Sequence, residues 1–158
     1  MTIHVATGIV RNRAGSVLLV ASTYANHPHP LWNLPGGRQT AGELLDATAA
    51  RELFEETGIR AEAGRLAYVS ESYDGETHVV NVTFEMNLLD EGNVEPAPPE
   101  TRDDHVAAVA WVPVAGLPER LTVDVVREPL LAYLGGDFPR RYVGFERAGI
   151  TIVWPDET

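Results

Sequence analysis

The sequence has 158 residues, of which 44% are apolar and 22% are charged, and these values fit one globular domain with a core of its own. The absence of cysteine excludes disulfides, thiolate metal sites and cysteine nucleophiles. A formal net charge of -11 argues against a nucleic acid polymer or an anionic membrane as the partner. We expect a cytoplasmic protein, because the sequence contains neither a membrane-length apolar run nor a signal peptide at its start.

The first third of the chain is predicted to form short strands. Residues 3–10 and 16–21 are rich in β-branched and aliphatic side chains and flank a turn-forming stretch, so they predict a β-hairpin. Two prolines make residues 24–30 a loop. Residues 31–34 predict a strand, which the following proline and two glycines should stop.

A helix is predicted at residues 44–57, which contain neither glycine nor proline and precede Gly58, a typical residue after a helix end. Further along we expect strands at 65–72, 78–88 and 106–114, an acidic proline-rich loop at 91–104, a helix at 122–134 and a terminal hairpin at about 138–158. In the second helix Thr122 is the N-cap candidate, and Pro129 should cause a kink or divide the helix into two short pieces. Mixed strands and helices without a repeat predict a single α+β layered domain over 1–158.

Three carboxylates gather on one face of the first predicted helix. With about 100° per residue and Glu52 at zero, Glu56 falls at about +40° and Glu55 at about -60°. Ala50 and Phe54 then lie on the far side, where they can pack on a sheet. Repulsion should raise the pKa of at least one carboxyl, and a hard divalent cation such as Mg²⁺ or Mn²⁺ would relieve it.

The surrounding spacing decides how these glutamates are interpreted. Taken alone, they also fit a solvated helix face on which Arg51 pairs with Glu55. However, residues 37–59 match the Nudix box G-x5-E-x7-R-E-U-x-E-E-x-G-U without departure, at Gly37, Glu43, Arg51, Glu52, Leu53, Glu55, Glu56, Gly58 and Ile59. The sequence therefore resembles the MutT-like Nudix hydrolases, with a looser likeness at residues 32–36 and 111–113.

This resemblance implies an α/β/α sandwich with a mixed sheet, in which the box forms a loop, a helix and a second loop. It also implies metal-dependent hydrolysis of a nucleoside diphosphate linked to another moiety. By the same resemblance Glu52, Glu55 and Glu56 hold the metal, the Gly36 carbonyl can add a ligand, and Arg51 orients the carboxylates. Glu43 assists Arg51 and also suits the start of the helix.

Other roles in the expected reaction are less determined. Glu52 is the first candidate for the base that takes the proton of the attacking water, and Glu56 is the second. An acid from the loop at 91–104 could serve instead, the candidates being Glu100, Asp103 and Asp104. Substrate contacts are expected from Arg38, Trp32 and Asp104, although Trp32 also suits core packing and the acids also suit a solvated loop.

Two other functions compete with hydrolysis. A nucleotide-sensing Nudix module that no longer cleaves would have lost carboxylates of the box, and all of them are present. A Nudix-type isomerase acting on isopentenyl diphosphate would use a cysteine. The signatures that accompany ADP-ribose, NADH or coenzyme A substrates are missing, which leaves a nucleoside triphosphate or related nucleotide. A homodimer through the terminal hairpin is a further option.

Overall fold

Two β-sheets form the centre of the molecule. The computed structural model describes residues 1–89 and 105–154. The larger sheet has the order β4-β1-β6-β5-β8, formed by β4 (Gly36–Arg38), β1 (Thr2–Ile9), β6 (Thr77–Leu88), β5 (Ala61–Asp74) and β8 (Tyr142–Phe145). The smaller sheet has the order β3-β2-β7, formed by β3 (Leu31–Asn33), β2 (Val17–Ser22) and β7 (Val106–Val112).

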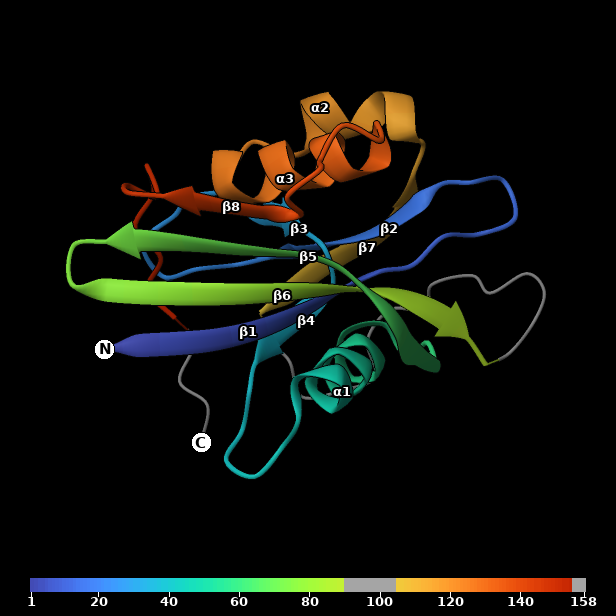
Figure 1. Cartoon of the computed structure of the whole chain (residues 1–158), viewed down its shortest axis with the longest axis horizontal. Helices are drawn as coiled ribbons and strands as arrows, with labels where there is room; N and C mark the ends of the chain where they lie inside the picture. Colours follow the sequence, from blue (N-terminus) through green and yellow to red (C-terminus); the bar gives the residue numbers. More distant parts are fainter. Residues whose placement is uncertain (90–104, 155–158) are drawn as a thin grey trace.

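Helices cover the sheets from opposite sides (Figure 1). Helix α1 (Leu45–Thr57) lies on one side, and α2 (Leu117–Arg120) and α3 (Asp124–Leu134) lie on the other, with a 3₁₀ turn at Val114–Gly116 before α2. The larger sheet is mixed, because β1 pairs with β6 and β5 with β8 in parallel, whereas its other pairs are antiparallel. The predicted α+β sandwich with a mixed sheet is thus confirmed.

Each helical layer covers a separate apolar core. Under α1, Ala49 and Leu53 pack with residues of both sheets such as Ala6 and Leu18. Under α2 and α3 a second core contains Ile9, Leu19, Tyr68, Leu117, Leu121 and Leu130. Most of these side chains are fully buried, and their burial is the main favourable contribution to the free energy of folding. The two cores hold α1 and the pair of sheets in a defined position.

The predicted opening hairpin is wrong in one respect. The turn forms, because Asn12 accepts hydrogen bonds from Ser16 and from Gly15, and Arg11 bridges to Val17. The two strands then diverge, with β1 entering the larger sheet and β2 the smaller one. Strand β3 ends at Asn33, before Pro35, as predicted, but strand β4 was not predicted: Gly36 is its first residue and pairs with Thr7. Local turn chemistry could not show that two sheets separate here.

The C-terminal half also departs from prediction. Val123 is the N-cap of α3, so Thr122 is not the cap. Helix α3 contains the buried Pro129 and is not divided into two pieces. Strand β8 forms, but it pairs in parallel with β5, and residues 150–154 are not a strand, so the described part of the terminal segment is no hairpin. No helix of the described residues is long and apolar enough to cross a membrane. A single domain over 1–158 stays a prediction.

Candidate active site

Helix α1 turns two of its three glutamates inward. Glu52 and Glu56 have exposed fractions of only 8% and 3%, on the same buried stripe as Leu53. Phe54 is 40% exposed and packs its ring under the Arg60 guanidinium, so the expected contact of Phe54 with a sheet is wrong. The predicted carboxylate arc exists, but it faces strand β4, because the apolar stripe that orients α1 runs through Ala49 and Leu53.

The inward carboxylates lie against two glycines of β4. The Gly36 N–H donates a hydrogen bond of 2.8 Å to Glu56 Oε1. A Cβ at Gly37 would lie 2.4 Å from the carboxyl carbon of Glu52, so only glycine leaves room for that side chain. A Cβ at Gly36 would meet the Ala6 carbonyl oxygen at 2.4 Å. Both glycines are therefore needed for close approach, one by a carboxylate and the other by the backbone of β1.

The Arg51 guanidinium contacts three carboxylates, two of them on α1 and one just before it. Its guanidinium donates to Glu43 at 2.7 Å, to Glu52 at 3.0 Å and to Glu55 at 3.2 Å, and also to the Arg38 carbonyl. The Arg51 ion pair is the main reason why the pKa of Glu43 is lowered to about 2, and in return the pairing raises the pKa of Arg51. Glu43 also accepts hydrogen bonds at the helix start, as predicted. Arg51 is thus a fixed positive charge beside the glutamates.

The donor set suits a hard divalent cation in its chemistry. Glu52, Glu55 and Glu56 offer only oxygen, and Mg²⁺ and Mn²⁺ prefer such ligands. Protein donors hold these carboxylates: Arg51 contacts Glu52 and Glu55, and Gly36 contacts Glu56. Among the described residues no three acidic or histidine side chains converge as an assembled metal site. The residues fit the cation by type and by shared helix face, and the metal role of each stays a proposal.

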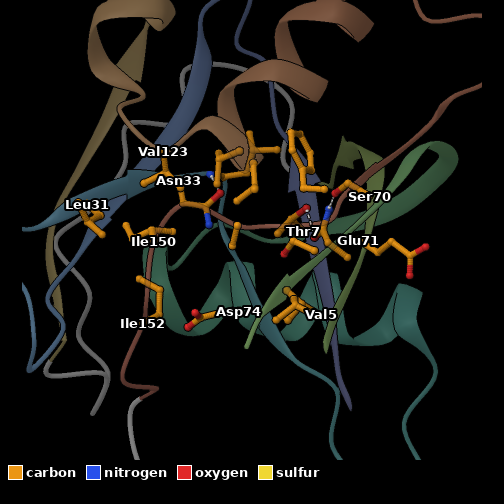
Figure 2. A pocket seen from close by; sticks show the side chains of 18 of the residues that line it. Val5, Thr7, Leu31, Asn33, Ser70, Glu71, Asp74, Val123, Ile150 and Ile152 are labelled. Atoms are coloured by element: carbon orange, nitrogen blue, oxygen red, sulfur yellow. Dashed lines mark hydrogen bonds between the residues drawn. The ribbon is translucent and has the colours of Figure 1, made fainter. Parts of the chain in front are cut away.

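A pocket adjoins this site between the two sheets (Figure 2). Its polar residues include Thr7, Ser70 and Asn81 of the larger sheet, and its apolar residues include Leu31 and Trp32 of β3. Tyr24 also lines the pocket, and its pKa is raised by burial and, as a second cause, by the charge of Glu56. The pocket therefore lies within electrostatic reach of the inward glutamates.

The other predicted site residues are scattered. Trp32 lines the pocket and packs on the second core, with the Arg120 guanidinium 4.6 Å from its ring centroid. Its expected core packing is therefore observed, and its contact with a substrate stays a prediction. Arg38 follows Gly37 in β4 and lies 5.9 Å from the ring centroid of Trp154. Asp104, like Glu100 and Asp103, lies outside the described residues. The structure thus brings the glutamates, Arg51 and Glu43 together and places Trp32 at the neighbouring pocket.

Sequence reasoning missed the segment after β8. Ile150, Ile152 and Trp154 line the pocket, although they follow the predicted box by about a hundred residues. The sequence predicts a terminal hairpin at about 138–158, and this prediction did not point to a pocket wall. Tyr24 was also missed, since a tyrosine in a proline-rich loop carries no signal of burial. Only the tertiary structure brings these side chains to the site.

Comparisons with known proteins agree with the sequence motif. The family model described as NUDIX domain matches residues 2–134. The phosphatase NudJ of Escherichia coli (strain K12) is 30% identical over 130 residues, which cover 82% of this chain and 78% of NudJ. MutT4, a candidate mutator protein of Mycobacterium tuberculosis, is 39% identical over 95 residues, which cover 58% of this chain. The match spans only 36% of the length of MutT4.

The fold is shared with solved structures. A NUDIX hydrolase from Nitrosomonas europaea superposes with a TM-score of 0.71 at 18% sequence identity, covering 87% of this chain and 91% of that one. A MutT protein from Methanosarcina mazei superposes with a TM-score of 0.63 at 24% identity, covering 89% and 92%. At these identities the likeness concerns the fold alone.

Proposed function

The chain belongs to the Nudix hydrolase family, and from this premise we propose that it hydrolyses a diphosphate linkage in a nucleoside triphosphate or related nucleotide, with the help of a divalent metal ion. The observation that carries the proposal is the pair of buried glutamates, Glu52 and Glu56, turned onto Gly36 and Gly37. Burying two neighbouring carboxylates costs free energy even when hydrogen bonds and an ion pair offset part of it, and such groups gather at sites with a chemical task. The full set of acids favours catalysis over mere nucleotide sensing.

Each residue of the site receives a role under this proposal. Glu52, Glu55 and Glu56 would hold Mg²⁺ or Mn²⁺, with the Gly36 carbonyl as a further ligand. The bound ion would neutralise diphosphate charge and acidify a water. Glu52, with Glu56 second, is the proposed acceptor of the water proton.

Arg51 and Glu43 are proposed as positioning residues. Arg51 touches Glu52 and Glu55, so it limits the rotamers that these carboxylates adopt. Glu43 in turn holds the other edge of the Arg51 guanidinium. Arg38, which follows Gly37 directly, is proposed to contact a substrate phosphate through its forked donors.

The test is hydrolysis of a nucleotide panel with Mg²⁺ or Mn²⁺, followed as release of phosphate, diphosphate or nucleoside monophosphate. We expect at least one substrate, and Glu52→Gln should lower kcat by about 10²- to 10⁴-fold. Glu119→Gln makes the same chemical change at an exposed position of helix α2 and should leave the rate unchanged. Full activity of Glu52→Gln, or inactivity of the wild type on the whole panel, would reject the proposal.

The competing sensing function gives a different outcome in the same assay. A sensing module would bind a nucleotide tightly and release no product from it with either metal. The cytoplasmic location and the homodimer expected from the sequence stay predictions, to be checked by cell fractionation and analytical ultracentrifugation.

A further inference from the structure

The segment after β8, residues 148–154, forms a wall of the pocket, and we call it the C-terminal strap. Its side chains alternate between half-buried and exposed positions along the whole segment. The half-buried positions are Ala148, Ile150, Ile152 and Trp154, and all four line the pocket. The strap begins after residue 134, where the match to the family model ends. It is therefore a feature of this chain that the family match does not cover.

Hydrogen bonds from the exposed side hold the strap in place. Asn26 donates to the Thr151 carbonyl at 2.5 Å and accepts from the Val153 N–H at 3.1 Å. His27 Nε2 lies 2.8 Å from the same carbonyl, and the Thr151 hydroxyl donates to Asp74 at 3.1 Å. These bonds use the backbone and outward side chains of the strap. The half-buried side chains of the strap are therefore available to contact a ligand in the pocket.

Opposite the strap, the larger sheet presents a polar floor. Thr7 is hydrogen-bonded to Thr83 at 2.7 Å and donates to Asn81 at 3.0 Å, and Asn81 donates to Ser70 at 3.2 Å. Figure 2 shows Ile150 and Ile152 on one side of the pocket and Thr7 and Ser70 on the other. An apolar wall facing a polar floor suits a flat molecule with an apolar face and polar edges.

The charge of the pocket restricts what enters it. Its lining contains two carboxylates, Glu71 and Asp74, and none of the lining residues that the structure describes is basic. The hydroxyl of Tyr142 and the ring of His78 bond to Glu71, and these bonds lower the pKa of that carboxyl. A phosphate group would therefore be repelled. An uncharged part of a ligand would meet no such repulsion.

The pocket lies close to the glutamates of α1, because Tyr24 in its lining feels the charge of Glu56. Strand β3, which lines the pocket, leads within three residues to Gly36, whose N–H holds Glu56. At the far end of the strap, the Trp154 ring lies near the Arg38 guanidinium of β4. One ligand can thus keep its phosphates beside α1 and its uncharged end beside the strap.

We infer that the strap residues Ile150, Ile152 and Trp154 bind the nucleobase of the substrate and determine which base is accepted. This inference rests on the proposed function for the position of the diphosphate. The ligand class is a nucleotide whose base is planar and uncharged at neutral pH. Apolar and aromatic side chains bind the face of such a ring, and the pocket acids repel an anionic group.

The experiment measures the binding of AMP, GMP, CMP and UMP by calorimetry with Mg²⁺ present. Trp154→Ala and Ile152→Ala should weaken the binding of the preferred monophosphate, about tenfold for the tryptophan, which is the size expected for one lost stack. Val153→Ala is the matched control, because Val153 lies on the same strap, is 49% exposed and does not line the pocket. Inorganic diphosphate should bind equally to all variants.

Each result supports or overturns the inference. The inference is overturned if Trp154→Ala and Ile152→Ala bind every monophosphate as tightly as the wild type does. It is also overturned if the wild type binds no monophosphate. A loss that is the same for diphosphate would indicate general damage and would also overturn it. Thermal melts of the variants identify unfolding, and Ile150→Val, a milder change, then takes the place of an unfolded variant.

The two proposals fail separately. If nucleotides bind with strap-dependent base preference but are not hydrolysed, the strap inference holds and hydrolysis fails. If hydrolysis occurs and the strap variants retain the base preference of the wild type, hydrolysis holds and the strap inference fails.

Discussion

The inner face of α1 and the pocket under the C-terminal strap are neighbouring regions built in different ways. The first is charged and compact in sequence, because Gly36, Glu43, Arg51 and the three glutamates come from strand β4, helix α1 and the loop between them. The second gathers side chains from Val5 to Trp154 and has an apolar wall. A short motif can thus specify reaction chemistry, whereas the choice of ligand depends on segments that meet only in the fold.

The strongest test of the charged region is Gly37→Ala. The new Cβ would overlap the Glu52 carboxylate, which is the flexible end of a side chain and can move away. We therefore expect a folded protein whose kcat is lower by about 10²-fold or more, in the range of losing one catalytic group. The comparison variant is Gly36→Ala, whose Cβ meets the Ala6 carbonyl and which should lose stability instead. Wild-type turnover by Gly37→Ala would contradict the proposed role of Glu52.

The ion pair between Glu43 and Arg51 should give a smaller effect, which depends on pH. Because the pKa of Glu43 is lowered from 4.5 to about 2, its stabilisation is complete above pH 4.5 and is lost as the pH falls toward 2. Glu43→Gln should cost about 1–3 kcal/mol at pH 7 and progressively less in acid. Urea unfolding of both proteins at several pH values measures this. A cost that does not change between pH 7 and pH 2 would show that charge is not its source.

Removing Asn26, which anchors the strap, should have a weaker effect on the kinetics. Asn26→Ala deletes the side chain that bonds to Thr151 and Val153, both at exposed positions. We expect KM for the preferred nucleotide to rise by roughly threefold to tenfold, with kcat nearly unchanged, in line with about 1 kcal/mol for exposed hydrogen bonds. Steady-state kinetics measure both constants. A fall in kcat alone would place Asn26 in the reaction and not in the strap.

The smallest effect is expected on the outer face of α1. Phe54 is 40% exposed and contacts Arg60, so Phe54→Ala should cost less than about 1 kcal/mol and leave activity intact. Chemical denaturation gives the cost. A loss of about 3 kcal/mol or more, typical of a core phenylalanine, would mean that the ring packs on the sheet as the helix pattern predicted.

The sequence by itself determined the helix at Leu45–Thr57, its end at Gly58 and the spacing of its glutamates. These features depend on local preferences and on the helical period, which act within a few residues. Glu43 lies just before the start of that helix, as predicted, and its partners Thr48 and Arg51 are five and eight residues further along the chain.

Only the tertiary structure decided the rest. The helix pattern placed Phe54 against a sheet, but packing of Ala49 and Leu53 turned α1 so that Glu52 and Glu56 face β4. A terminal hairpin was expected at about 138–158, but β8 pairs in parallel with β5 and residues 150–154 form no strand. Strand pairing and helix rotation are set by burial between distant segments, and an alternating pattern is the same whichever partner covers it.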